Sequence, residues 1–389
     1  MKVLAAFDKF KDCLSAREAC DTAAACLREK HPGWQVETCP LTDGGEGFCE
    51  ILTHAANGQL HTIRVLDAQF REVPASYGTV QARNLPPDAA TLLGLSRDAA
   101  GTVAIVEMAQ ASGLEQLARD DRNPWDASSC GTGQLMREAC QRDATVLLLG
   151  IGGSATNDLG LGAMEALGVE FLGEDGPLPH ITPGQFSQIV EIDLHSNLLP
   201  LPPIRIACDV DNPLLGPEGA TSIFGPQKGL AVDSLPAMEA AVAHAANVLC
   251  ETTGHDENAL HMPGSGAAGG IGCGLHLATG AHFVKGFSLV AAWLGLERKI
   301  QEADLVLTGE GRLDASSLHG KGPWAILQQA AASGKPVHAF AGSVTDEVLE
   351  ALPWGAHAHA IQPEGMALED ALAAGPELLA HAVDSFAHD

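Results

Sequence analysis

The stretch from Thr145 to Asp158, TVLLLGIGGSATND, places small and polar residues directly after a run of aliphatic ones. Its candidate ligand-binding residues are Gly152, Gly153, Ser154, Thr156, Asn157 and Asp158. Glycines let backbone N–H groups approach an anion closely, and the hydroxyl and amide groups add hydrogen bonds. The pattern also fits a tight turn followed by a helix that Asp158 caps, so by itself it leaves anion binding and a structural turn open.

Similar loops follow several other apolar runs. They add the candidates Asp8 and Lys11; Asp43, Gly44, Gly45 and Glu46; Asp209 and Asn212; Gln227 and Lys228; Gly264, Gly266, Gly269 and Gly270; and Glu310, Arg312, Asp314 and Lys321. Any one loop could be only a turn, and Lys228 could be a solvated side chain. Because ligands of open α/β sheets bind beyond the carboxyl ends of the strands, the recurrence of these loops favours a ligand-binding site.

The elements that position these loops alternate along the chain. Apolar runs predict strands at 2–7, 34–41, 101–108, 145–151, 204–210, 304–309 and 336–342. Amphipathic patterns predict helices at 15–31, 46–57, 235–254 and 324–334, the first of which begins with a capping box of Ser15 and Glu18. Strands that alternate with helices indicate an α/β protein with a mainly parallel sheet and helices on both faces.

Composition restricts the class of protein. With 389 residues, the chain is long enough for two domains. Its formal net charge of −27 repels polyanions and argues against nucleic acid as a partner, although backbone N–H groups can still hold a small anion. Neither a membrane span nor a signal peptide is recognisable, so we expect a cytoplasmic protein without a membrane partner. The ten cysteines are scattered without a CxxC pair, which favours buried thiols over disulfides or metal ligands.

Standard nucleotide and metal motifs do not match. ASSLHGKGP has Ala315 in place of the first glycine of a phosphate-binding P-loop and Gly322 in place of its Ser or Thr. DGGEG supplies only part of a dinucleotide fingerprint. His357 and His359 alternate along an expected strand, which favours a structural role over zinc binding.

The order of the loop motifs resembles the bacterial glycerate kinases of the type-1 family. The resemblance extends from Met1 to about Glu347 and rests on DKFKDCLSA, LTDGGEG, GIGGSATND, DVDNPLLGPEGA, FGPQKG, PGSGAAGG, LTGEGRLDASSLHGK and AGSVTDE. The chain departs from the family pattern in the first loop, where Phe7, Lys9 and Asp12 replace Pro, Ser and Gly. It also departs at Thr42 and Ser265, where the family has small residues.

The resemblance implies a function and an architecture. The function is ATP-dependent phosphorylation of D-glycerate with Mg²⁺, most often to 2-phosphoglycerate. The architecture is a Rossmann-like parallel-sheet domain formed by both chain ends, with a second α/β domain inserted and the active site in the cleft between them. We expect the first domain at 1–67 and 284–389 and the inserted domain at 68–283, so that the strands at 2–7, 304–309 and 336–342 share one sheet. The sequence leaves the phosphorylated hydroxyl, the Mg²⁺ ligands and the oligomeric state undetermined.

Phosphoryl transfer to an alcohol assigns roles to particular residues. The attacking hydroxyl must be oriented and relieved of its proton, for which Asp209 is the first candidate base and Asp158 the second. Either carboxylate could instead bind Mg²⁺ or cap a helix. The cations that can stabilise charge on the phosphoryl oxygens are Lys11, Lys228, Arg312 and Lys321, and Arg312 also suits the substrate carboxylate.

Two other classes of function stay open at this point. A nicotinamide-dependent dehydrogenase would use the same kind of sheet, but the missing glycine fingerprint speaks against it. A non-enzymatic protein that binds a small acid would need no ATP.

Overall fold

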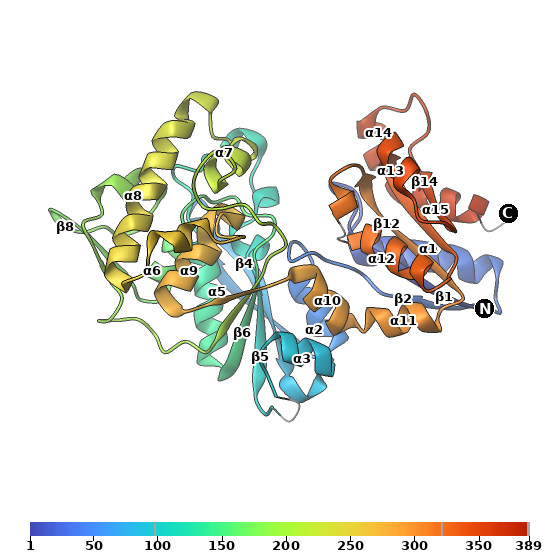
Figure 1. Ribbon diagram of the computed structural model, residues 1–389, viewed down its shortest axis with the longest axis horizontal. Coiled ribbons are helices and arrows are strands. Elements are labelled where there is room, and N and C mark those ends of the chain that lie inside the picture. The colour runs from blue at the N-terminus through green and yellow to red at the C-terminus, as the bar shows by residue number, and fades with distance from the viewer. Residues whose placement is uncertain (97–98, 320–321, 387–389) are drawn as a thin grey trace. The chain divides into compact units, whose positions relative to one another are not determined.

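The computed structural model describes residues 1–96, 99–319 and 322–386, and this part of the chain divides into two compact units (Figure 1). Unit 1 comprises Met1–Asp43 and Val290–Asp389, and unit 2 comprises Gly44–Leu289. The expected boundaries near residues 67 and 284 differ from these limits. The first differs most, because residues 44–67 belong to unit 2.

Unit 1 is built on a parallel sheet with the strand order β14-β13-β12-β1-β2. The strands are β1 (Lys2–Phe7), β2 (Gln35–Thr38), β12 (Leu305–Leu313), β13 (Val337–Val344) and β14 (Ala356–Ala360). The helices are α1 (Ala16–Lys30), α11 (Leu296–Glu302), α12 (Gly322–Ala332), α13 (Asp346–Ala351), α14 (Leu368–Ala373) and α15 (Gly375–Phe386). The three segments predicted to share a sheet do so, because β1 pairs with β12 and β12 pairs with β13.

The core of unit 1 follows from the sequence pattern. The capping box of Ser15 and Glu18 is present at the start of α1, as predicted. Side chains at helical spacing, such as Ala19, Ala23 and Leu27, are buried on the face of α1 that packs with α15. This packing holds the carboxyl end of β1, where the first candidate loop begins.

Unit 2 contains a mixed sheet with the strand order β11-β10-β6-β5-β4-β3. Its strands are β3 (Gln59–Leu66), β4 (Glu72–Gln81), β5 (Thr102–Glu107), β6 (Ala144–Gly150), β10 (Ile204–Ala207) and β11 (His282–Val284). A smaller antiparallel sheet consists of β7 (Glu170–Gly173), β8 (Gly176–Pro177) and β9 (Glu191–Asp193).

The helices of unit 2 surround these sheets (Figure 1). They are α2 (Phe48–Ala55), α3 (Pro87–Leu92), α4 (Ala109–Ser112), α5 (Cys130–Gln141), α6 (Leu161–Ala166), α7 (Ala220–Phe224), α8 (Leu235–Thr253) and α9 (Ile271–Thr279). The next helix, α10 (Gly286–Leu294), begins in unit 2 and ends in unit 1.

The segment around residue 67, expected to cross between domains, is a hairpin turn within unit 2. Strands β3 and β4 pair antiparallel on either side of it. Asp67 is buried and closes the turn, because its carboxylate accepts hydrogen bonds from the backbone of Gln69 and Arg71 and pairs with the Arg71 guanidinium. The sequence signal was weak because β3 carries polar and apolar residues on both faces: Leu60 is exposed, whereas His61 is partly buried.

No helix within the described ranges is both long and apolar enough to cross a membrane. The ten cysteines are free thiols, and seven of them are buried.

Candidate active site

In unit 1, the loop that follows β1, the carboxyl-terminal part of β12 and Asp43 line a cavity of about 410 Å³. Lys9, Lys11 and Arg312 bring positive charge to its lining, and Asp8, Asp43 and Glu310 bring negative charge. Five of the predicted candidates therefore come together here, namely Asp8, Lys11, Asp43, Glu310 and Arg312. Gly44, Gly45 and Glu46 belong to unit 2, Asp314 borders Arg312, and Lys321 lies outside the described residues.

Glu310 is the most perturbed carboxyl group of this cavity. Burial raises its pKa to about 8, and the nearby Asp8 and Asp43 carboxylates add to the effect. A hydrogen bond from the Ser317 hydroxyl at 3.0 Å acts in the opposite direction. The cavity thus holds a concentration of negative charge that a bound cation would relieve.

Arg312 and Asp314 form an ion pair, with 3.0 Å between Arg312 Nε and Asp314 Oδ2. The Ser316 side chain and backbone N–H also donate to Asp314, and these hydrogen bonds keep the pKa of its carboxyl group below the usual value. Asp314 therefore shapes its own turn, and the Arg312 side chain, 66% exposed, remains accessible to a ligand.

The first loop of unit 1 has an unusual backbone conformation at Asp12. Its φ of 59° lies in the left-handed region, which glycine adopts freely and Asp tolerates better than most residues. This conformation agrees with the glycine that the resembled family has at this position, and Asp is among the residues that can replace it there.

In unit 2, the loop at 44–47 lies directly against the loop that follows β6. The Gly152 N–H donates to the Gly44 carbonyl at 2.9 Å. A Cβ atom on Gly152 would lie 2.6 Å from Gly45 Cα, so no side chain fits between the two loops. Glu46 lies beside Gly153 in the same contact. The sequence-predicted glycines of these two loops are therefore brought together by close backbone packing.

Lys228 links a third loop to the same strand end. Its side chain is 2% exposed and donates to Ser154 Oγ at 2.8 Å and to the Thr156 carbonyl at 2.5 Å. The interpretation of Lys228 as a solvated side chain is therefore wrong. Burial lowers its pKa to about 7, although the nearby Asp158 carboxylate opposes the shift.

Thr156 and Asn157 each keep one unpaired polar atom. Thr156 Oγ1 and Asn157 Oδ1 are buried without a hydrogen-bond partner among the described residues. Asn157 Nδ2 donates to Thr221 Oγ1 at 3.0 Å, which fixes the orientation of the amide. Such atoms carry a desolvation cost that a local change of the loop or a bound water would reduce.

Asp158 is fully buried and its carboxylate is occupied by the protein. One oxygen accepts from the Ser129 backbone at 2.7 Å, the Ser129 hydroxyl at 2.6 Å and Gly162 N–H at 3.3 Å, and the other accepts from Gly160 N–H at 3.2 Å. These bonds leave the carboxylate poorly placed to take a proton from a substrate. The helix-cap interpretation of Asp158, at the start of α6, therefore agrees better with its contacts.

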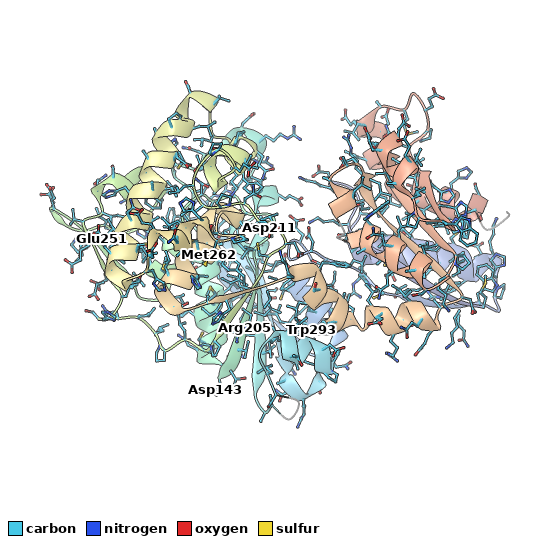
Figure 2. All side chains as sticks on the ribbon, viewed as in Figure 1. Asp143, Arg205, Asp211, Glu251, Met262 and Trp293 are labelled. Atoms are coloured by element: carbon cyan, nitrogen blue, oxygen red, sulfur yellow. The ribbon has the colours of Figure 1, made fainter. Side chains whose placement is uncertain are left out.

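Asp209 follows β10 and is half-buried. Its Oδ2 accepts from the Phe287 N–H at 2.7 Å, in the first turn of α10. Figure 2 labels Arg205 within β10 and Asp211 beyond its carboxyl end, where Asp211 pairs with Lys285 at 2.9 Å. Asn212 donates to the Glu218 carbonyl at 2.8 Å and holds its own loop, and the exposed Gln227 side chain precedes the buried Lys228.

The glycine-rich segment at 264–270 packs against the loops after β6 and β10. A Cβ atom on Gly269, whose φ is +71°, would lie 2.2 Å from the Thr156 carbonyl oxygen. Gly264 and Gly266 approach the loop at 208–213, and Gly270 lies next to Leu159. Ser265 departs from the family pattern but adds bonds, because its hydroxyl donates to the Leu260 carbonyl and accepts from Leu214 N–H.

Glu107, which ends β5 in unit 2, is a buried carboxyl group that was not among the candidates predicted from the sequence. It is 1% exposed and accepts from the Cys49 N–H at 3.0 Å, in the first turn of α2. Burial raises its pKa to about 7. A carboxylate directly after an apolar strand is the signal that singled out the other loops, so the same criterion could have found it. Glu107 fixes the start of α2 and, with it, the loop at 44–47.

We expect the stability of the wild type to rise with pH because of Lys228, and we expect Lys228→Met to abolish this rise. The folded-state pKa of Lys228 is about 7, below its ordinary value of 10.5, so folding releases a proton between these two pH values. The free energy of unfolding of the wild type should therefore rise with pH, by about 2 kcal/mol over the first two pH units. Met has a similar volume and does not titrate. Urea titrations followed by circular dichroism at several pH values measure the difference.

Lys30→Met is the matched control for this prediction. Lys30 pairs with Asp384 near the surface, at the end of α1, so its replacement should leave the pH profile close to that of the wild type. If Lys228→Met keeps the rise with pH, the buried position of the Lys228 amine is contradicted.

The chain is similar to known proteins over most of its length. A family model described as the glycerate kinase family matches residues 3–389. The chain is 38% identical to the glycerate 2-kinase of Escherichia coli K12 over 356 residues, which cover 90% of this chain and 87% of that protein. It is 36% identical to the glycerate kinase of Bacillus subtilis 168 over 375 residues, which cover 95% of this chain and 93% of that protein.

A solved crystal structure from Salmonella typhimurium LT2, described provisionally as glycerate kinase 2, is also similar. The match has a TM-score of 0.76 and 35% sequence identity, and it covers 100% of this chain and 97% of that one.

Proposed function

This chain belongs to the glycerate kinase family and is a kinase; on that premise we propose that it transfers the γ-phosphoryl group of ATP to D-glycerate and forms 2-phosphoglycerate. This premise is supported by the family match over residues 3–389 and by the similarity to a protein named glycerate 2-kinase. Neither a dehydrogenase nor a non-enzymatic binding protein agrees with this family membership.

One observation carries the proposal beyond the family name, namely the mixed charge of the unit 1 cavity. Lys9, Lys11 and Arg312 line it together with three carboxyl groups. Phosphoryl transfer spreads negative charge over the phosphoryl oxygens, so positioned cations are the main catalytic contribution that a protein makes. We assign Lys11 to the transferring phosphoryl group and Arg312 to the glycerate carboxylate, which its planar guanidinium can bind through two hydrogen bonds.

The carboxyl groups of the same cavity fit the Mg²⁺ that accompanies ATP. No group of three or more His, Cys, Asp or Glu side chains is placed to hold a metal ion in the described part of the chain. Mg²⁺ usually takes one or two protein carboxylates and completes its shell with water and phosphate oxygens, so a pair drawn from Asp8, Asp43 and Glu310 would suffice. Bound there, Mg²⁺ would neutralise charge on the phosphates. Burial is the main cause of the raised pKa of Glu310, and the like charge of Asp8 and Asp43, which adds to it, is what the ion would relieve.

For the proton of the attacking hydroxyl we propose Asp209. One oxygen of its carboxylate accepts the Phe287 N–H at 2.7 Å, which orients the side chain. An oriented carboxylate of this kind can accept a hydroxyl proton. Asp158 is less suited to the role because its oxygens already accept bonds from Ser129, Gly160 and Gly162.

The proposal is tested by measuring ADP release with purified protein, ATP, MgCl₂ and D-glycerate. We expect turnover that depends on D-glycerate and is much slower with L-glycerate or with no acceptor. NMR of the product distinguishes the 2-phosphate from the 3-phosphate, because phosphorylation shifts the resonances of the substituted carbon. ADP release that does not depend on D-glycerate would contradict the assignment, and a 3-phosphate product would contradict its regiochemistry only.

A further inference from the structure

The unit 1 cavity has a second, apolar wall that no sequence motif indicated. Beside the charged loops, it is lined by Ile361, by Leu368, Ala371 and Leu372 of α14, and by Leu378 of α15. Leu368 is 65% exposed and leaves apolar surface that a ligand could cover. Glycerate alone is small and polar and would gain little from this wall.

We propose that this cavity is the nucleotide site and that the purine base lies against the wall formed by Ile361, α14 and the start of α15, with the phosphates toward Lys9 and Lys11. The inference rests on the proposed function, but it adds a location and a set of residues. The cavity volume of about 410 Å³ falls within the usual range for small-molecule sites. A nucleotide site requires apolar surface that the base can cover and a few charged groups that can bind the phosphates.

The wall also offers hydrogen bonds to the edge of a base. Gln362 lines the cavity, its backbone N–H donates to the Gly342 carbonyl at 3.2 Å and its Nε2 donates to the Met366 carbonyl at 2.8 Å. These bonds hold the side-chain amide in place. An amide carries two N–H donors and an accepting oxygen, so Gln362 retains the capacity to bond a purine.

The wall is rigid where it meets the first loop. The Cys13 thiol donates to the Leu372 carbonyl at 3.2 Å, and a Cβ atom on Gly375 would lie 1.9 Å from Cys13 Sγ. The start of α15 therefore packs on Cys13 with no space between them. A preformed surface loses little entropy when a flat base binds to it.

The charge of the cavity is compatible with a polyphosphate. Asp8 and Asp43 would repel it, but Lys9, Lys11 and Arg312 offset them.

The test replaces Ala371, which is buried in the wall, by Leu and titrates the full-length protein with ADP in a calorimeter. The added methyl groups occupy the space of the base, so we expect the Kd for ADP to rise about tenfold or more. The KM for D-glycerate should change by less than about twofold, because Arg312, which we assign to the glycerate carboxylate, belongs to β12 and not to the apolar wall. The matched control is Ala373→Leu, the same change two residues later on α14 at an exposed position, which should bind ADP as the wild type does.

Photolabelling supplies an independent readout of location. In the wild type, 8-azido-ADP should label peptides within residues 361–378, and excess ATP should suppress the label. Labelling confined to unit 2, or equal ADP affinities for Ala371→Leu and Ala373→Leu, would overturn the inference. A rise in the glycerate KM alone would assign the cavity to the acid and overturn it as well.

These outcomes separate the inference from the proposed function. Turnover of ATP and D-glycerate by a protein whose ADP affinity is unaffected by Ala371→Leu refutes the location only. A wild type that neither binds ADP nor turns over ATP refutes both.

Discussion

Replacing Asp209 by Asn is expected to lower the turnover number by about a hundredfold to ten-thousandfold, the usual contribution of a general base. Asn has nearly the same size and keeps an oxygen that can accept the Phe287 N–H, so the local structure at the start of α10 should persist. The substitution removes the basicity of the side chain at position 209. The KM for D-glycerate should change little, because the amide can still contact the attacking hydroxyl. Steady-state kinetics at saturating ATP separate the two parameters.

Asp211→Asn is the matched control, since it makes the same change two residues later. Asp211 is exposed and pairs with Lys285 at the surface, a contact of small energetic value, so turnover should stay within about twofold of the wild type. Near-normal turnover of Asp209→Asn would refute the base assignment and indicate that positioning alone carries the reaction. Loss of substrate or Mg²⁺ binding with little effect on turnover would identify Asp209 as a ligand.

The second large effect is expected for Lys11→Ala, which should lower the turnover number by about a hundredfold to a thousandfold. The Lys11 side chain is exposed and lines the unit 1 cavity, so its ammonium group is available to the phosphoryl oxygens. Charge on those oxygens is highest in the transition state, so the loss should appear in turnover more than in the Kd for ADP. Steady-state kinetics combined with calorimetric titration of ADP measure both quantities.

Two further lysines show whether the effect belongs to Lys11. Lys30→Ala removes a positive charge of unit 1 that pairs with Asp384 away from the cavity, and should leave turnover unchanged. Lys9→Ala tests the neighbouring cavity lysine, which replaces Ser in the resembled family. Equal losses for Lys11→Ala and Lys30→Ala would mean that only the overall charge matters, and would refute the assignment of Lys11.

Several features of the fold were predictable from local pattern. The capping box predicted the start of α1, and buried runs of aliphatic residues predicted β1, β5, β6 and β12. The hairpin of β3 and β4 was not predicted, because polar and apolar residues occur on both faces of β3 and the turn depends on the buried Asp67. The expected boundary at residue 67 was placed wrongly for the same reason.

The residues that follow the strands, and the family to which their motifs point, could be read from local pattern. Runs of aliphatic residues and glycines are local signals, so Gly152, Lys228 and Asp209 could be singled out from the amino-acid sequence. Their contacts depend on the folded chain. Asp158 is occupied because Ser129, which lies 29 residues away, donates to it, and Lys228 is buried because it reaches Ser154, 74 residues away. Burial and hydrogen-bond partners arise from segments that are distant in the chain, and no local pattern encodes them. The apolar wall of the unit 1 cavity has the same origin, since α14 and α15 meet the loop after β1 only when the sheet has formed.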